Sequence, residues 1–319
     1  MLGQRILITG GTGSFGHAFV RRLLERAGPS RPARIVIYSR DEAKQQAMRM
    51  EFANHAGLRF FLGDVRDLQR LRLAFRGVDI VVHAAALKQV EACEYNPSEA
   101  VATNIGGTQN VAVTAIECGV KRVVALSSDK AVAPLNLYGA TKSAAEALIR
   151  AANSYSSPGG TRLAAVRYGN VAGSRGSVIP LWRAALAAGA PLQITDPDAT
   201  RFWFTLDGAV GLVEWTLEHM RGGELVVPEL SAFRVRDLAA AMTGGAPTVI
   251  VGPRVGDKTH ESMIGADEAT YFRRWQGRLI RFLPGDDRGE SLEAGFVYRS
   301  DLAPRMSVQA LRWALAAIP

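Results

Sequence analysis

The N-terminal segment places a glycine-rich turn directly between an apolar strand and a helix. Residues 5–9 read Arg-Ile-Leu-Ile-Thr, and Gly10-Gly-Thr-Gly-Ser-Phe-Gly16 follows at once, before a helical pattern begins. Glycines at this spacing allow a tight turn, close approach of the backbone to a pyrophosphate, and close packing of helix on strand. The helix N-terminus then directs unpaired N–H groups at the phosphates. The cofactor contacts predicted in this turn are Gly10, Thr12, Gly13, Ser14, Phe15 and Gly16.

Short β-branched runs alternate with helical patterns through the first half of the chain. The expected strands are 6–9, 35–38, 59–62, 80–83, 123–127 and 163–167. The expected helices between them include 18–26, 67–75, 100–118 and 141–153. This alternation predicts an α/β fold, a doubly wound parallel Rossmann sheet with helices on both faces. Ligands bind at the carboxyl ends of such strands, where glycine and polar residues gather in this sequence.

After about residue 170 the pattern breaks into shorter segments rich in Gly, Pro and Arg. We therefore predict an NADP-binding Rossmann domain over 1–172 and a smaller C-terminal substrate domain over 173–319. A segment near 201–221 is expected to return to the first domain.

The end of the second strand bears on the choice of nicotinamide cofactor. NAD enzymes usually carry an acidic residue there, which binds the ribose 2′-hydroxyl. This chain has Ser39-Arg40-Asp41, with Lys44 following. A guanidinium can meet a 2′-phosphate through two parallel hydrogen bonds. Asp41 weakens this indication of NADP. Arg40 and Lys44 can also be interpreted as solvated charges at the start of a helix. The pattern favours NADP over NAD, bound by Ser39, Arg40, Asp41 and Lys44.

A phenol and an amine lie one helical turn apart in the expected helix near residue 140. Tyr138 and Lys142 are four residues apart and share one helix face. A nearby ammonium lowers the pKa of a phenol, which makes it a general base for an alcohol proton. Asp129 and Lys130 precede this pair and suggest a second proton-transfer step.

Composition restricts the class of partner. The 319 residues include 38 basic and 30 acidic side chains, a formal net charge of +8, without a basic tail or interleaved aromatics. This spread argues against nucleic acid as a partner and fits an anionic cofactor and substrate.

Asp79, His83 and Lys88 interrupt the most apolar run of the sequence, so no membrane span is expected. Two cysteines and five histidines lack metal-binding spacing, and the N-terminus reads as a strand rather than a signal peptide. A cytoplasmic protein without a metal is predicted.

Together these motifs resemble the extended short-chain dehydrogenase/reductase superfamily, and within it the soluble UDP-N-acetylglucosamine 4,6-dehydratases that invert C5 and begin pseudaminic acid synthesis. The segments that carry the resemblance are 9–16, 38–42, 63–67, 84–88, 103–104, 167–171, 173–177, 195–196, 200–203 and 258–261. The Asp129-Lys130 pair is the discriminating feature, since common hexose 4,6-dehydratases place Asp-Glu there. The membrane-bound, C5-retaining branch typically has Met at the position of Tyr138. This chain departs from the usual pattern at Ser128, where Thr is common, and at Asp257, where Glu is common.

The resemblance implies an internally balanced redox cycle on a UDP-sugar. Tyr138 would take the C4 hydroxyl proton while the C4 hydride passes to NADP. Lys130, if neutral, would remove the C5 proton, and Asp129, if protonated, would protonate the departing C6 hydroxyl. Burial favours both shifts toward neutrality, whereas their mutual attraction opposes them. Ser127 and Ser128 would orient the C4 oxygen.

The resemblance also implies further binding residues and a homo-oligomer. Further cofactor contacts are Asp64, Val65, Ala84, Ala85, Lys88, Asn104, Tyr138, Lys142, Tyr168 and Asn170. Substrate contacts are Lys88, Asn170, Val178, Thr195, Arg201, Arg254 and Glu261. For the substrate diphosphate, Arg254 is the stronger candidate and Arg175 the weaker one. Lys88 and Asn104 have a second interpretation, as residues that cap local structure.

Three alternatives remain open from the sequence. A 4-epimerase needs the pair Tyr138 and Lys142 but gains nothing evident from Asp129 and Lys130. A C5-retaining dehydratase would share most of the same motifs. A non-catalytic NADP-binding regulator would be expected to lose Tyr138 or Lys142, and both are present.

The end of the second strand generates one testable prediction. The cofactor released from purified protein by denaturation is expected to be mostly NADP, because Arg40 can pair with the 2′-phosphate. Arg40→Asp should shift the preference toward NAD. Chromatography of the denatured supernatant measures both, and chiefly NAD from the unaltered protein would contradict the prediction.

Overall fold

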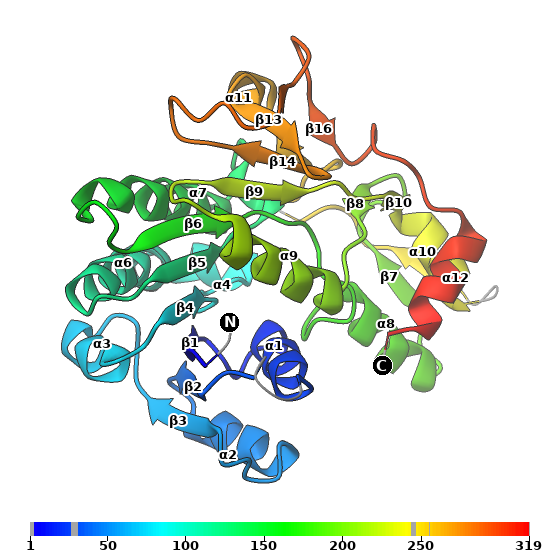
Figure 1. Cartoon of the computed structure of the whole chain (residues 1–319). Coiled ribbons are helices and arrows are strands. Elements are labelled where there is room, and N and C mark those ends of the chain that lie inside the picture. The colour runs from blue at the N-terminus through cyan, green and yellow to red at the C-terminus, as the bar shows by residue number, and fades with distance from the viewer. Residues whose placement is uncertain (1–2, 27–30, 244–246, 255, 319) are drawn as a thin grey trace.

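A single large sheet organises the molecule (Figure 1). The computed structural model describes residues 3–26, 31–243, 247–254 and 256–318. Within these residues the main sheet has ten strands in the order β15-β13-β14-β9-β6-β5-β4-β1-β2-β3. The strands from β3 to β9 in this order are parallel, and β14, β13 and β15 continue the sheet antiparallel. The parallel strands are β1 (Arg5–Thr9), β2 (Arg34–Ser39), β3 (Leu58–Leu62), β4 (Ile80–His83), β5 (Arg122–Leu126), β6 (Arg162–Val166) and β9 (Leu225–Pro228).

Helices cover both faces of this sheet (Figure 1). On one face, α1 (Ser14–Leu24) packs against α9 (Leu206–His219). On the other face, α3 (Leu68–Phe75), α6 (Gly107–Glu117) and α7 (Leu137–Ala151) lie in a row. The predicted doubly wound parallel sheet is therefore confirmed. Helix α9 falls inside the segment 201–221 that was expected to return to the sheet.

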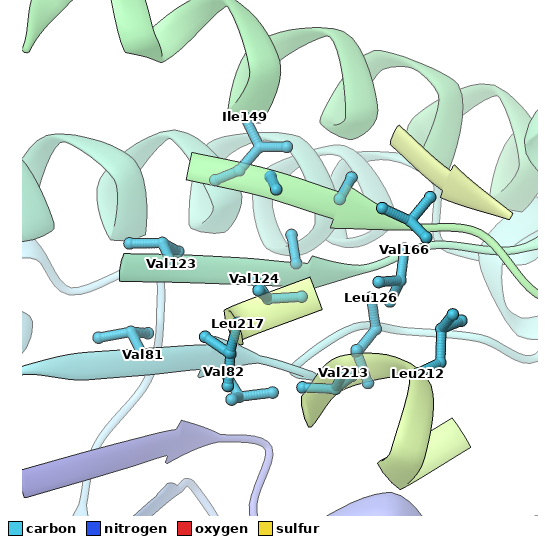
Figure 2. Packing of buried hydrophobic residues seen from close by; sticks show 14 of the residues in the cluster. Val81, Val82, Val123, Val124, Leu126, Ile149, Val166, Leu212, Val213 and Leu217 are labelled. Atoms are coloured by element: carbon cyan, nitrogen blue, oxygen red, sulfur yellow. The ribbon is translucent and has the colours of Figure 1, made fainter. Parts of the chain in front are cut away.

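The core explains why the central strands read as continuous apolar runs. In a parallel sheet both faces are covered, so successive residues are buried whichever face they point to. Strand β5 shows this pattern, since Val123 and Val124 are both completely buried. Figure 2 shows β4, β5 and β6 between Ile149 of α7 on one side and residues of α9 on the other. The labelled residues of α9 are Leu212, Val213 and Leu217.

The expected elements of the first half match the observed ones closely, with one difference. The single helix expected over 100–118 is interrupted. It consists of α5 (Pro97–Val101), a π-helical turn over Ala102–Gly106, and then α6. Two further helices, α2 (Glu42–Glu51) and α4 (Val90–Tyr95), were not singled out from the sequence.

The second half of the chain has two structural roles. It extends the main sheet through β9, β13 (Phe272–Trp275), β14 (Arg278–Arg281) and β15 (Glu290–Ser291). It also forms a second apolar cluster of its own, made by Ile179, Trp182, Leu192, Ile194, Phe233, Leu238, Ala239, Leu311 and Leu315. These residues come from α8 (Val178–Ala187), β7 (Leu192–Ile194), β10 (Ala232–Arg234), α10 (Val235–Thr243) and α12 (Val308–Ala316). The domain boundary at residue 172 stays a prediction.

Short strands and a helix complete the second half. Strand β10 pairs with β8 (Thr200–Phe202), β11 (Thr248–Ile250) with β7, and β12 (Ser262–Ile264) with β16 (Tyr298–Arg299). Helix α11 (Ala266–Ala269) follows β12. Among the described residues, no helix has the length and apolar character needed to cross a bilayer.

One buried arginine joins three elements at the end of β6. Arg167 is only 3% exposed and donates to Glu146 of α7 at 3.0 and 2.7 Å. Its other hydrogen bonds reach Glu268 of α11 and the carbonyl of Met263 in β12. Removing one partner of a buried ion pair leaves the other charge uncompensated in a low dielectric, which strongly destabilises the fold.

The position of Arg167 predicts a large stability loss on substitution. Arg167→Met should lower the free energy of unfolding by about 3–5 kcal/mol, because Glu146 stays buried without its cation. The matched control is Arg274→Met, which breaks an exposed pair with Glu229. That change should have an effect of about 1 kcal/mol or less. Urea denaturation followed by circular dichroism measures both, and equal losses would contradict the argument.

Candidate active site

The loop between β1 and α1 has the geometry of a dinucleotide site. Gly10 has a φ of 64°, and a Cβ there would lie 2.8 Å from the backbone of Ala85. A Cβ at Gly16 would lie 2.0 Å from the carbonyl oxygen of Gly11. Gly13 is the N-cap of α1 and offers no side chain to the N–H groups of the first turn. Those donors can therefore bind an anion such as a pyrophosphate, and the residues present fit the cofactor predicted for this loop.

Three of the four residues predicted to select NADP also stabilise local structure. The Ser39 hydroxyl accepts a hydrogen bond from Gln45 at 3.0 Å. Asp41 caps α2 by accepting from the backbone N–H of Lys44 at 2.9 Å, and its other oxygen pairs with the Lys44 ammonium. The carboxylate that weakened the sequence signal is thus already engaged at the start of α2.

Arg40 is less constrained than its neighbours. Its side chain is about half exposed, and its ion pair is a 3.5 Å contact with Asp64. Asp64 is held more closely by Arg66, at 2.7 Å. Burial raises the pKa of the Asp64 carboxyl, but the hydrogen bonds and charge of Arg66 outweigh it and leave this pKa below its usual value. The neighbouring Val65 is buried against Gly107 of α6.

The loop after β4 is held by the π-helical turn. Asn104 is 2% exposed, and its side chain accepts from the N–H of Leu87 at 2.8 Å and donates to the carbonyl of Leu87 at 2.9 Å. The amide also donates to Thr141 of α7. The contacts of Asn104 therefore connect the loop that carries Ala84, Ala85 and Lys88 to α7. Its predicted contact with the cofactor stays a prediction.

Tyr138 and Lys142 lie on the first turns of α7, as the spacing predicted. Asn136 caps this helix by accepting from the N–H of Gly139 at 2.8 Å. A Cβ at Gly139 would lie only 2.2 Å from the carbonyl oxygen of Lys130. Glycine at this position lets the 3₁₀ turn Asp129–Ala131 lie directly on the start of α7, beside Tyr138.

The protonation of the Tyr-Lys pair differs from the expectation. Burial raises the pKa of the Tyr138 phenol, and the charge of Lys130 opposes that rise. Burial lowers the pKa of Lys142 to about 8, with Glu146 opposing. The ammonium of Lys142 donates to the carbonyl of Leu126. The nearby cation that favours the phenolate is therefore Lys130 rather than Lys142.

Lys130 belongs to a cluster of four charged side chains, with Asp129, Glu261 and Arg201. Its ammonium lies 3.2 Å from Asp129 Oδ1 and 3.2 Å from Glu261 Oε1. Arg201 approaches the same Glu261 oxygen at 3.6 Å, and Ser128 donates to Asp129 Oδ1 at 2.8 Å. Asp129 and Glu261 are almost completely buried. Their second oxygens, Oδ2 and Oε2, have no hydrogen-bond partner among the described residues.

The pKa of Lys130 shifts away from the neutral amine that removal of a C5 proton would require. Burial alone would lower its pKa, but Asp129 and Glu261 together outweigh burial, and the net shift is upward. Lys130 is therefore an ammonium here. The short contact with Asp129 allows a proton to pass from Nζ to Oδ1, which would give a neutral amine beside a carboxylic acid. The Ser127 hydroxyl is also buried and has no partner among the described residues.

The remaining predicted residues lie at the start of α8 or in the segments that follow β6 and β7. Tyr168 is buried, and the pKa of its phenol is raised by burial. Asn170 follows at the exposed end of β6, Val178 begins α8, and Thr195 comes directly after β7. Contacts of these residues with a substrate stay predictions.

Two arginines considered for a diphosphate lie in different places. Arg254 is exposed and lies 3.5 Å from the exposed carboxylate of Glu91. Arg175 instead lies against the glycine-rich loop, where its N–H donates to the hydroxyl of Ser14 at 3.1 Å. Lys88 donates to the carbonyl of Arg175 at 3.2 Å. The structure thus brings Arg175 and Lys88 together at the cofactor loop.

Sequence reasoning missed three residues that support the site. Asn136 fits the preference for asparagine at an N-cap, just before the pattern of α7 begins. Glu146 stands four residues after Lys142, on the same helix face. Gly139 carried no local signal, because its neighbour is the carbonyl of Lys130. Among the described residues, no group of three or more His, Cys, Asp or Glu side chains could hold a metal ion.

The fold and the site together define an extended short-chain dehydrogenase/reductase, with a glycine-rich dinucleotide loop, a Tyr-Lys pair on α7 and an added cluster of charged side chains around Lys130. The chain belongs to the family described as polysaccharide biosynthesis protein, whose profile matches residues 6–279. This confirms the resemblance noted in the sequence.

Within this family, the chain is similar to several named proteins and solved structures. It is 44% identical to a UDP-N-acetylglucosamine 4,6-dehydratase (inverting) from Campylobacter jejuni, covering 94% of this chain and 93% of the relative. It is also 44% identical to a UDP-glucose 4-epimerase from Rickettsia typhi, over 83% of this chain and 79% of that one. A crystal structure of Pen from Bacillus thuringiensis superposes with a TM-score of 0.91 at 35% identity, covering 99% and 98% of the two chains.

The lowered pKa of Lys142 predicts how stability changes with pH. The folded chain binds this proton less tightly than the unfolded chain, so its stability should rise as pH increases from about 8 to about 10.5. Lys142→Met should remove this rise, which is on the order of 3 kcal/mol. Urea midpoints of both proteins at the two pH values provide the test. Parallel pH profiles would show that Lys142 titrates normally.

Proposed function

We propose that this chain is a UDP-N-acetylglucosamine 4,6-dehydratase of the C5-inverting type that uses NADP. The observation that carries the proposal is the Asp129–Lys130 pair with Glu261, held against the start of α7 beside Tyr138. The two Campylobacter jejuni relatives, 44% and 43% identical over almost the whole chain, support the same reaction.

The first step requires a base for the C4 hydroxyl. Tyr138 would accept that proton as the C4–H bond breaks. NADP, when bound, supplies the acceptor for the C4 hydride and later returns the hydride to C6. Burial raises the pKa of the Tyr138 phenol, and the charge of Lys130 opposes that rise. Ser128, beside Asp129, offers a hydroxyl that can hold the C4 oxygen.

The second step requires one base and one acid at adjacent carbons. The new C4 ketone acidifies the C5 proton, which would pass to the Lys130 amine. Asp129 would give its proton to the C6 hydroxyl, which leaves as water, and a C5–C6 double bond forms. Elimination would return Lys130 to an ammonium and Asp129 to a carboxylate. The hydride then returns to C6, and C5 is protonated from the opposite face.

The choice of NADP rests on Arg40. It is the half-exposed cation at the end of β2, whereas Asp41 and Lys44 pair with each other. Solved structural relatives at 28% and 25% identity, DesIV and MoeE5, contain NAD, so the Arg40→Asp comparison addresses a real alternative.

A 4-epimerase is the second candidate, because the Rickettsia relatives are named UDP-glucose 4-epimerases. Incubation of pure protein with UDP-N-acetylglucosamine, followed by NMR of the product, separates the candidates. A C5-inverted 4-keto-6-deoxy sugar supports the proposal. A C4 epimer with C6 still hydroxylated identifies an epimerase, and a C5-retained ketone identifies the retaining reaction. An unchanged sugar in the presence of bound cofactor favours a regulator.

Further features of the protein follow from the same proposal. The product would serve pseudaminic acid synthesis, and the protein would be a cytoplasmic homo-oligomer that acts on a UDP-sugar without nucleic acid or membrane. Size-exclusion chromatography with light scattering measures the oligomeric state directly.

The proposed role of Lys130 predicts a separation of oxidation from elimination. Lys130→Ala should still oxidise C4, because the proton acceptor Tyr138 remains, although oxidation should slow because the charge of Lys130 no longer opposes the raised pKa of the phenol. Reduced cofactor should therefore accumulate at up to one equivalent per site. A single-turnover absorbance trace at the reduced nicotinamide band detects it. Unaltered enzyme working in D₂O should place deuterium at C5. Full turnover without accumulation, or no reduction at all, would remove Lys130 from this role.

Tyr138→Phe is the matched variant for the first step. It keeps the ring but removes the proton acceptor, so turnover should fall by about 10²–10⁴-fold without reduced cofactor accumulating. A correctly folded variant with nearly normal turnover would show that another group is the base.

A further inference from the structure

The segment after β6 crosses to the glycine-rich loop and places an arginine there. The backbone N–H of Arg175 donates to the Ser14 hydroxyl at 3.1 Å. The Arg175 guanidinium donates to the carbonyl of Thr12. Gly176, with a φ of 72°, passes so near the loop after β4 that a Cβ there would lie 3.0 Å from the Gln89 amide. Arg175 is therefore seated between the first and fourth strand-end loops.

Two basic residues, Lys88 and Arg175, are in contact here, and neither has an acidic partner among the described residues. Lys88 donates to the carbonyl of Arg175 at 3.2 Å. Burial lowers the pKa of Lys88, and the charge of Arg175 lowers it further. Neither side chain forms an ion pair with a carboxylate in the part of the chain that the structure describes. By contrast, Arg40 lies near Asp64 and Arg254 near Glu91.

Neighbouring cations with no carboxylate between them form a site for an anion. An anion placed between them would relieve their repulsion and accept charge-assisted hydrogen bonds. The first turn of α1, whose N-cap Gly13 offers no side chain, contributes backbone donors at the same loop. The chemistry that satisfies all of these groups is the pyrophosphate of a nucleoside diphosphate.

We propose that Arg175, supported by Lys88, binds the pyrophosphate of the dinucleotide cofactor and retains the cofactor at the glycine-rich loop. The cofactor is favoured over the substrate as the source of the pyrophosphate because both hydrogen bonds of Arg175 to this loop reach Thr12 and Ser14. The inference rests on the proposed function only in requiring a dinucleotide at this loop.

Retention is useful in a reaction that borrows a hydride and returns it. If the reduced cofactor left after the first transfer, the sugar would remain as an oxidised intermediate. Arg175 belongs to the segment that leads into α8, where substrate contacts are predicted. The hydrogen bonds of Arg175 to Thr12 and Ser14 therefore connect the segment predicted to bind substrate to the glycine-rich loop.

The test compares cofactor affinity with nucleotide affinity in the full-length chain. Arg175→Ala should weaken NADP binding by about 10- to 100-fold, because a hydrogen bond to a charged group contributes about 1.5–3 kcal/mol. Binding of UDP should change less than about 3-fold. Fluorescence titration with NADPH and calorimetry with UDP measure the two affinities, and cofactor content after gel filtration of the purified protein measures retention.

Two further variants make the outcome decisive. Arg34→Ala removes an exposed arginine at the amino end of β2, far from the loop, and should leave both affinities unchanged. Arg175→Gln keeps a polar side chain with a hydrogen-bond donor but without the charge, and it replaces the alanine variant if that one fails to fold. Loss of NADP affinity in Arg175→Gln supports the proposal that the charge of Arg175 binds the cofactor pyrophosphate.

Three results would overturn the inference: unchanged NADP affinity, a loss confined to UDP, or equal losses for both ligands. A loss confined to UDP would assign Arg175 to the substrate diphosphate. Failure of the proposed function is distinguishable, because an unaltered protein that binds NADP but forms no dehydrated sugar leaves the Arg175 comparison intact.

Discussion

The candidate active site depends on one close approach between backbones. The turn that carries Asp129 and Lys130 can lie on α7 because Gly139 has no side chain, and a Cβ there would lie 2.2 Å from the Lys130 carbonyl oxygen. This contact joins the residue pair at the end of β5 to the residue pair on α7. Without the contact between Gly139 and the Lys130 carbonyl, the phenol of Tyr138 and the ammonium of Lys130 would lie farther apart. Two proton-transfer steps can share one site because these two elements touch.

The same approach places a lysine among buried charges that fix its protonation. Two carboxylates and one guanidinium lie around Lys130, and buried ion pairs are stable only when their geometry offsets the loss of water. Asp129 and Glu261 each retain one oxygen without a partner among the described residues. A sugar hydroxyl that donates a hydrogen bond to one of those oxygens would change how strongly each carboxylate attracts the proton of Lys130. The protonation state of Lys130 would then depend on whether a ligand is bound beside this cluster.

Local sequence patterns predicted the fold and the local geometry of the glycine-rich turn and of the Tyr-Lys pair, but not the contacts between distant segments. The apolar runs, the glycine-rich turn and the spacing of Tyr138 and Lys142 all reflect neighbours in the chain, and these predictions agree with the structure. Burial would lower the pKa of Lys130, and the upward shift comes from the adjacent Asp129 together with Glu261, which is 131 residues away. The position of Arg175 on the glycine-rich loop depends equally on a fold-level contact, with Thr12, across 163 residues. Periodicity contains no information about such distances, so sequence reasoning could not find this contact and named Arg175 only as the weaker candidate for the substrate diphosphate.

The π-helical turn over Ala102–Gly106 makes this part of the chain sensitive to length. A π turn contains about one residue more than an α turn, and each residue advances an α-helix by about 100°. Loss of a single residue here would let α5 and α6 fuse into one regular helix and rotate Asn104 away from Leu87 and Thr141. The loop after β4 would then lose its anchor even though every side chain of the site was still present. Related chains that carry a one-residue gap in this turn should therefore hold that loop by a different contact.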